Sequence, residues 1–285
     1  MKKLFLSLAT VGLLFTACDK DKNKNDGTNK LPSKMTTVYT YSNGDEPEEY
    51  FVAFEYDGQN RMTKLTWDDG SYDEFSYNAD NTLSKCFEYD AWDTTYCQRE
   101  FIYSGNLMFI KWSNWYSQGE PITWNETMDT VTLENGRMTK WISRYGDIET
   151  FTYNSNGNIT RSEYQYYGNS YYTDYEYTDI PSIFRHANVP DWVFWWEIGA
   201  ELSKSGYMLK KITDDDGDIT EYAYETNGDY VSKRTSTFSW EEETPDASNA
   251  SKRKAARAKQ RAKRLAASVT VTGTETVTYE YIDAK

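Results

Sequence analysis

Apolar and polar residues alternate along most of the chain, and short clusters of Asp, Asn and Gly interrupt the alternation. Segments such as VYTY at residues 38–41 and YFVAFEY at residues 50–56 place rings on one face and Thr or Glu on the other. A period of two predicts β-strands, and clusters such as WDDGSY at residues 67–72 and DDDGD at residues 214–218 predict tight turns. Counting the segments between turns predicts about fourteen strands joined by short loops.

One unit of this pattern repeats. The sequences FEYDGQNRMTK (residues 54–64), FSYNADNTLSK (75–85) and FTYNSNGNITR (151–161) share an aromatic-x-Tyr segment, a turn rich in Asp, Asn and Gly, and an apolar residue before Thr or Ser and a basic residue. Shortened or stretched copies begin at Val131 and Tyr222. Aromatic and β-branched residues favour a pleated surface, and Asn or Asp followed by Gly supplies the positive φ of a hairpin turn. Each unit therefore predicts a β-hairpin.

Successive hairpins predict an all-β fold, a long antiparallel up-and-down meander over residues 35–285. A sheet of this length twists, and it curls or closes into a barrel, which also removes exposed strand edges. The polar face of the strands carries Thr, Glu and Lys, whereas a lipid-facing barrel needs an apolar outer band. We expect a soluble barrel or a strongly curved sheet with an aromatic interior.

A Trp-rich segment at residues 180–204, IPSIFRHANVPDWVFWWEIGAELSK, breaks the alternation. Its prolines and apolar run predict a helical or loop insert that plugs one end of the barrel. Trp192, Trp195 and Trp196 are candidate ligand contacts, because aromatic side chains can form platforms that stack on sugar rings. The alternative is that these rings belong to the core, as most rings of an aromatic interior must.

A second irregular segment, residues 245–266, predicts a basic helical insertion near the C-terminus, because Ala, Lys, Arg and Gln are strong helix formers. It either contacts an anionic surface or is a solvated helical excursion in a loop. The candidate contact residues are Lys252, Arg253, Lys254, Arg257, Lys259, Arg261, Lys263 and Arg264.

The first seventeen residues have the pattern of a signal peptide. Met1-Lys2-Lys3 is positively charged, residues 4–15 are mainly apolar, and the small residues Thr16 and Ala17 precede Cys18. Cys18 resembles the lipobox cysteine of bacterial lipoproteins, which is acylated and becomes the first mature residue. Residues 18–34 then predict the lipidated Cys and a flexible polar tether, similar to the sorting tails of Bacteroidetes lipoproteins. The resemblance implies a lipid anchor in the outer membrane, at the cell surface or on the periplasmic face.

Charge and cysteine content narrow the chemistry further. The net charge is −14, and this acidic balance argues against a nucleic-acid partner. Cys86 and Cys97 flank a predicted turn at residues 90–93 that would place them directly opposite each other, so we expect either a disulfide or two free buried thiols. We expect no catalytic residue, no cofactor and no metal site.

The repeated units resemble the YD repeats of the Rhs class. The full arrangement of lipobox, tether, FTYNSNGNITR units, Trp-rich insert and final YEY strand resembles uncharacterised Bacteroidetes lipoproteins with a porin-like β-barrel domain. This resemblance implies a fold and an envelope location, and it implies no activity. We expect a binding or interaction module anchored to the membrane, with a glycan or an envelope protein as partner. A glycan hydrolase with paired inward carboxylates and a purely structural protein are the alternatives; the oligomeric state stays open.

Overall fold

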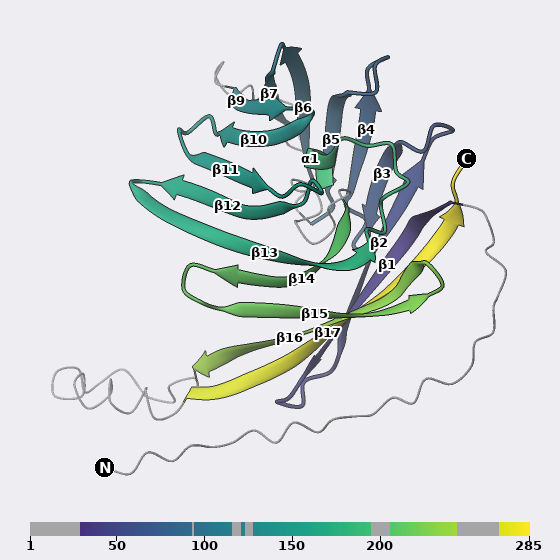
Figure 1. Ribbon diagram of the computed structural model, residues 1–285, viewed down its shortest axis with the longest axis vertical. Coiled ribbons are helices and arrows are strands. Elements are labelled where there is room, and N and C mark those ends of the chain that lie inside the picture. Colours follow the sequence, from purple (N-terminus) through teal and green to yellow (C-terminus); the bar gives the residue numbers. More distant parts are fainter. Residues whose placement is uncertain (1–28, 93, 116–120, 123–127, 195–205, 244–267) are drawn as a thin grey trace.

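The repeated hairpins join into one continuous antiparallel sheet in the computed structural model, which describes residues 29–92, 94–115, 121–122, 128–194, 206–243 and 268–285 (Figure 1). The described strands are β1 (Lys30–Tyr41), β2 (Glu48–Tyr56), β3 (Met62–Trp67), β4 (Tyr72–Tyr77), β5 (Leu83–Asp90), β6 (Thr95–Ser104), β7 (Leu107–Trp115), β8 (Pro121–Ile122), β9 (Asp129–Glu134), β10 (Arg137–Ile142), β11 (Ile148–Tyr153), β12 (Ile159–Tyr166), β13 (Asn169–Pro181), β14 (Tyr207–Asp214), β15 (Ile219–Asn227), β16 (Tyr230–Glu243) and β17 (Ser268–Asp283). A single turn of helix, α1 (Asp191–Val193), lies between β13 and β14.

The sheet closes on itself. Met35 of β1 pairs with Val52 of β2 on one side and with Tyr279 of β17 on the other, so the first and last strands are neighbours (Figure 1). β7 pairs directly with β9, and the two-residue β8 lies beside the end of β7. The described strands therefore form a closed, sixteen-stranded, up-and-down barrel. This confirms the predicted all-β meander and shows a closed barrel rather than a curved sheet, with more strands than expected.

The barrel starts earlier than residue 35. β1 begins at Lys30, and Leu31 is 1% exposed. The prediction that the tether extends to residue 34 was therefore wrong for its last residues, because the Leu-Pro pair that reads as linker in the sequence is buried at the start of the first strand. The signal peptide, Cys18 and residues 19–28 lie outside the described residues.

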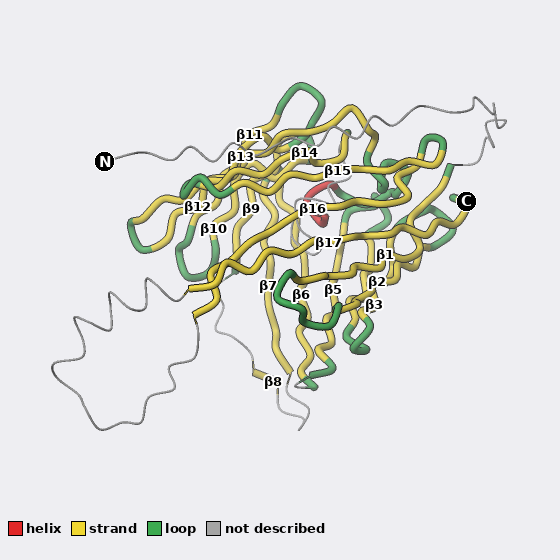
Figure 2. The backbone as a smooth tube through the Cα atoms, turned by 90° about the horizontal axis from the view of Figure 1, so that it is seen from below, coloured by secondary structure: helices red, strands yellow, loops and turns green. Residues whose placement is uncertain are grey.

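The predicted plug is present. After β13 the chain enters the barrel, where Phe184 packs against Phe54 with ring centroids 5.3 Å apart and Trp192 packs against Phe101 at 5.2 Å. Figure 2 shows α1 (red) among the surrounding strands. The backbone N–H of Asn188 donates to the carbonyl of Asn60, which places the plug at the end of the barrel that holds the β2–β3 turn. Residues 195–204 of the insert lie outside the described residues.

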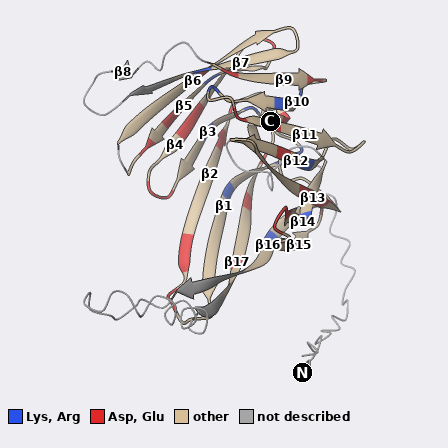
Figure 3. Cartoon of the chain, turned by 90° about the vertical axis from the view of Figure 1, so that its left-hand side faces the viewer, with Lys and Arg blue, Asp and Glu red and all other residues tan. Residues whose placement is uncertain are grey.

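Side chains along each strand point alternately into and out of the barrel, and the inward and outward ones differ in polarity. Fully buried inward side chains such as Leu65, Met108 and Val131 form an apolar layer beside the plug. The outward face carries cross-strand ion pairs, among them Lys64–Glu74 at 3.0 Å and Lys233–Glu225 at 2.9 Å. Figure 3 shows acidic and basic residues spread over the strands. The observed wall is thus apolar toward the plug and charged toward the outside.

None of the helical residues that the structure describes belongs to a helix long and apolar enough to cross a membrane.

Candidate functional site

The barrel has two unlike ends. The plugged end holds the β2–β3 turn, residues 57–61, and the packed segment 182–194. We call the opposite end, which holds the β1–β2 turn at residues 42–47, the mouth. The inward side chains differ between the two ends: they are apolar near the plug, and they are aromatic and charged near the mouth. On β1, for example, Met35 is buried, and Tyr39 and Tyr41 follow it on the same face.

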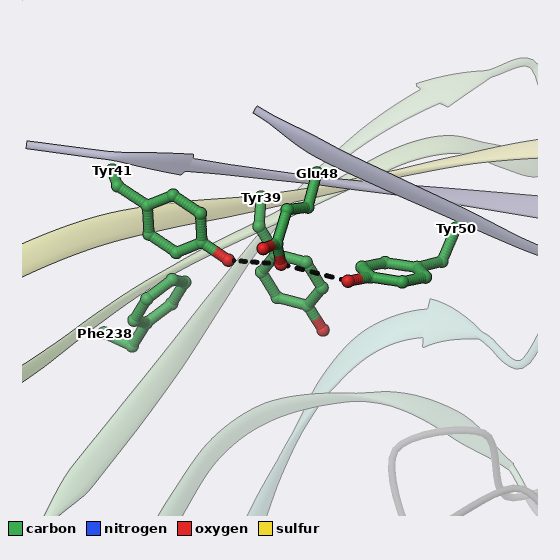
Figure 4. Close-up of a pocket in the computed structure, with 5 residues that line it drawn as sticks. All are labelled: Tyr39, Tyr41, Glu48, Tyr50 and Phe238. Atoms are coloured by element: carbon green, nitrogen blue, oxygen red, sulfur yellow. Dashed lines mark hydrogen bonds between the residues drawn. The ribbon is translucent and has the colours of Figure 1, made fainter. Parts of the chain in front are cut away.

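A pocket of about 350 Å³ lies at the mouth and is lined by Tyr39 and Tyr41 of β1, Glu48 and Tyr50 of β2, and Phe238 of β16 (Figure 4). We call these five residues the aromatic box. The three strands meet here only because the barrel is closed: β17 pairs with β1 on one side and with β16 on the other.

The rings of the aromatic box meet at steep angles. Tyr39 and Tyr50 have centroids 6.1 Å apart and planes at 65°, and Tyr39 and Phe238 are 5.9 Å apart at 67°. Tyr41 and Phe238 are 6.2 Å apart at 70°. Edge-to-face contacts of this kind are favourable for aromatic pairs. They hold the rings as walls around a space instead of stacking them into a solid layer.

Glu48 supplies the charge of the aromatic box. Its Oε2 accepts hydrogen bonds from the hydroxyl of Tyr41 at 2.9 Å and from the hydroxyl of Tyr50 at 3.0 Å (Figure 4). The hydrogen bond to Glu48 is the main cause that raises the pKa of Tyr41 to about 12, and it also raises the pKa of Tyr50. Both phenols therefore stay neutral donors at physiological pH.

Gly273 of β17 makes room for the box. It lies directly opposite Tyr41 on β1 and Phe238 on β16. A Cβ at this position would overlap the edge of the Phe238 ring and would come within 2.9 Å of the carbonyl oxygen of Thr40. The missing side chain lets the Phe238 ring lie across the backbone of β17, where it forms one wall of the pocket.

Glu275 supports the box from deeper in the barrel. It accepts hydrogen bonds from Arg234 at 3.0 Å, from Ser236 at 2.8 Å and from the hydroxyl of Tyr39 at 3.3 Å. The guanidinium of Arg234 is 3% exposed and lies 5.0 Å from the ring centroid of Tyr222. The charge of Glu275 is thus balanced by a buried arginine, and this ion pair fixes the position of Tyr39.

Other charged groups face the interior on the far wall. Trp112 donates its ring N–H to Asp129 at 3.0 Å, and the guanidinium groups of Arg99 and Arg144 lie 5.1 and 4.9 Å from its ring centroid. Glu149 stands opposite Trp141 and Tyr164 in the strand register, and burial raises its pKa from 4.5 to about 7. Inward carboxylates therefore occur around the barrel.

Trp192 is 4% exposed and packs in the core beside Phe101. This burial favours the alternative that its ring belongs to the core over the candidate role as a ligand contact. Trp195 and Trp196 lie outside the described residues, as do Cys18 and all eight basic residues of the 245–266 insertion.

The two cysteines do not face each other. Cys86 pairs with Arg99 and Cys97 pairs with Glu88, because the turn begins after the Asp90–Thr95 pair rather than after Tyr89. Cys86 and Cys97 are not joined by a disulfide in the structure; Cys86 is buried and Cys97 is half-buried. Diagonal positions on neighbouring strands are about 7–8 Å apart, beyond the usual Cα separation of a disulfide. The predicted register was therefore wrong, and of the two alternatives the structure has the separate thiols rather than the disulfide.

No group of three or more His, Cys, Asp or Glu side chains with the spacing of a metal site occurs among the residues that the structure describes.

Two porin-like proteins are among the solved structures that match this chain. A porin-like protein from Bacteroides uniformis matches 87% of this chain and 98% of its own, with 14% sequence identity and a TM-score of 0.36. A porin-like protein from Bacteroides vulgatus matches 89% of this chain and 99% of its own, with 10% identity and a TM-score of 0.38. The lipoprotein and YD-repeat parts of the family resemblance stay predictions. No protein-family model and no curated protein sequence matches the chain.

Proposed function

We propose that the chain is a lipid-anchored protein of the bacterial cell envelope that binds a small ligand at the mouth of its barrel, without catalysis. The observation that carries the proposal is the aromatic box itself, a pocket of about 350 Å³ whose rings stand apart around an accessible carboxylate. Ligand pockets in proteins combine apolar or aromatic walls with a few placed polar groups, and they commonly lie in the mouths of β-barrels.

The envelope location rests on residues 1–18. The positive start, the apolar segment and the small residues before Cys18 favour export and acylation of that cysteine. The outer face of the barrel supports an anchored rather than an embedded protein, because cross-strand ion pairs such as Lys85–Glu100 and Arg161–Asp174 suit contact with water. In this proposal the lipid holds the protein at the membrane, and the barrel presents its mouth to a glycan, a metabolite or another envelope component.

A glycan hydrolase is the second candidate, and Glu149 is the observation that favours it. A carboxyl group with a pKa of about 7 is suited to act as a general acid at neutral pH. Binding is preferred because the pocket at the mouth is lined by Glu48, a carboxylate that two tyrosine hydroxyls hold in place. A purely structural envelope protein would not need a set of rings held apart by Gly273 and Glu48.

Fractionation tests the anchor. The wild-type protein should sediment with membranes, and a Cys18→Ala variant should not. Protease digestion of intact cells would then place the barrel outside, while protection until lysis would place it in the periplasm. Equal release of wild type and Cys18→Ala would contradict the lipid anchor.

A thermal-shift panel tests binding. Purified protein is heated with sugars, amino acids and amines, and a ligand of the mouth should raise the melting temperature of wild type but not of Tyr50→Ala, which loses one wall of the box. Turnover of a glycan, abolished in Glu149→Gln, would favour the hydrolase. A panel in which nothing shifts the wild type would favour the structural role.

A further inference from the structure

We propose that the aromatic box is a site for an organic cation of the quaternary ammonium or methylated amine class. This inference rests on the binding role proposed above and adds the chemical class of the ligand. The box brings together four aromatic rings and one carboxylate around about 350 Å³. A cation near the face of an aromatic ring is attracted by the ring quadrupole, and several rings arranged as walls are the usual way in which proteins hold a methylated ammonium group.

The tyrosine hydroxyls of the box are already committed. Tyr41 and Tyr50 donate to Glu48, and Tyr39 donates to Glu275. A sugar or an anion would require free donors to satisfy its oxygen atoms, and all three phenol O–H groups point instead at carboxylates. Donation toward a carboxylate also polarises the phenol and increases the electron density of its ring. The committed donors thus disfavour a neutral sugar and strengthen the attraction for a cation.

Glu48 carries a charge that the described part of the chain does not neutralise by an ion pair. Both tyrosine hydrogen bonds reach its Oε2 (Figure 4), and its Oε1 accepts no hydrogen bond from the described residues. Glu275, one layer deeper, is instead paired with Arg234 at 3.0 Å. The two acids therefore have different roles: Glu275 positions Tyr39, and Glu48 offers its charge to a ligand.

The overall charge acts in the same direction. The chain carries 45 acidic and 31 basic residues, and its net charge of −14 raises the local concentration of cations at the surface. Glu48 and Tyr50 are both exposed at the rim, so the described residues leave the box open to a cation on this side. The pocket volume lies at the low end of the range for ligand sites, which fits a small head group rather than an oligomer.

Isothermal titration calorimetry of the full-length protein in a non-ionic detergent tests the proposal. The probes are choline chloride and the neutral analogue of choline in which carbon replaces the nitrogen atom. Both have the same shape, and only choline is charged. We expect choline to bind about tenfold more tightly than its neutral analogue, and we expect its affinity to fall as salt is added, because the difference is electrostatic.

Matched variants locate the site. Glu48→Gln should weaken choline binding about tenfold, since it removes the charge but keeps the shape. Glu49→Gln makes the same charge change on the next residue, whose side chain points to the outer face, and should leave the affinity unchanged. Phe238→Leu, which removes one ring from the box, should weaken choline binding about 3- to 10-fold and should leave the far-ultraviolet circular dichroism spectrum unchanged.

Each alternative result has a defined meaning. Equal affinity for choline and its neutral analogue, or equal effects of Glu48→Gln and Glu49→Gln, would overturn the cation site. If choline does not bind while a sugar from the thermal-shift panel does, the cation class is wrong and the binding role stands. If neither choline nor any panel compound binds, the binding role itself fails.

Discussion

Glu149 is the residue whose ionisation should be visible in the stability of the protein. In the folded state, burial raises its pKa from 4.5 to about 7. Between these two pH values the folded protein holds a proton that the unfolded chain has released, so stability falls as the pH rises through this window and levels off above it. A buried carboxylate without its proton is the destabilising species.

Glu149→Gln should therefore stabilise the protein by an amount that grows as the pH rises from about 4.5 to about 7 and is constant above. We expect an increase in the free energy of unfolding of about 1–3 kcal/mol near pH 8 and almost no change near pH 5, where the native carboxyl is already protonated. Urea denaturation at the two pH values measures this difference. Glu55→Gln removes an exposed carboxylate from the outer face of β2 and is the control. A stabilisation of Glu149→Gln that is the same at both pH values would show that ionisation is not the cause.

The tyrosine of the repeated hairpin makes the same hydrogen bond in several copies of the unit. Tyr77, Tyr153 and Tyr224 each donate a hydroxyl hydrogen bond to a backbone carbonyl fifteen residues earlier. For Tyr153 the acceptor is the carbonyl of Met138, at the bulge where the β9–β10 register shifts, and the distance is 2.7 Å. A bulge interrupts the ladder of hydrogen bonds. Each tyrosine thus links one hairpin to the preceding one.

Tyr153→Phe should show how much this link contributes. The ring stays in place, but the buried carbonyl of Met138 loses its partner, so we expect a loss of about 1–3 kcal/mol in the free energy of unfolding. Chemical denaturation measures the change. Tyr167→Phe is the matched control, because Tyr167 is 86% exposed in a turn at the mouth, and its hydroxyl removal should have almost no effect. Equal losses in both variants would contradict a role for the hydroxyl of Tyr153.

Hairpins could be predicted from the sequence, but their register could not always be. Asp57, Asn78 and Asn154 begin turns with the same backbone hydrogen bonds, as the repeated unit predicts. In the β5–β6 turn, however, the described residue with positive φ is Thr94, at 58°. Thr is uncommon in that conformation, so the pattern favoured Asp as the last turn residue and placed Cys86 opposite Cys97. The turn lies one residue later than predicted, at residues 91–94 instead of 90–93, and this shift of the register is enough to separate the two cysteines.

At the scale of the whole molecule, the pocket depends on contacts that no local pattern contains. Alternation predicts that Tyr39 and Tyr41 share a face, but it does not predict that Phe238 comes to meet them. That contact requires β17 to pair with β1, and the paired residues Thr40 and Thr274 are more than two hundred positions apart. The sequence therefore predicted the strands and the plug, left closure open, and offered as a candidate ligand contact Trp192, which is buried in the plug.

Closure also predicts that the chain can be cut and rejoined. The backbone N–H of Ala284 donates to the carbonyl of Asn29 at 2.7 Å, so the two ends of the barrel strands lie side by side. A circular permutant that joins residue 285 to residue 29 by a short Gly-Ser linker, with new termini at Trp92, keeps every strand pair intact. Trp92 is 92% exposed in the β5–β6 turn, where a break costs little packing.

We expect this permutant to fold with an unchanged circular dichroism spectrum and a melting temperature within a few degrees of that of residues 29–285. A second permutant with new termini at Val277, which is 0% exposed, cuts β17 between its partners β1 and β16 and should fail to fold. Thermal unfolding and size-exclusion chromatography compare the two. If both permutants fold equally well, β17 does not close the ring. The wall of the aromatic box formed by Phe238 would then not be held against β1, and the site at the mouth would have to be abandoned with it.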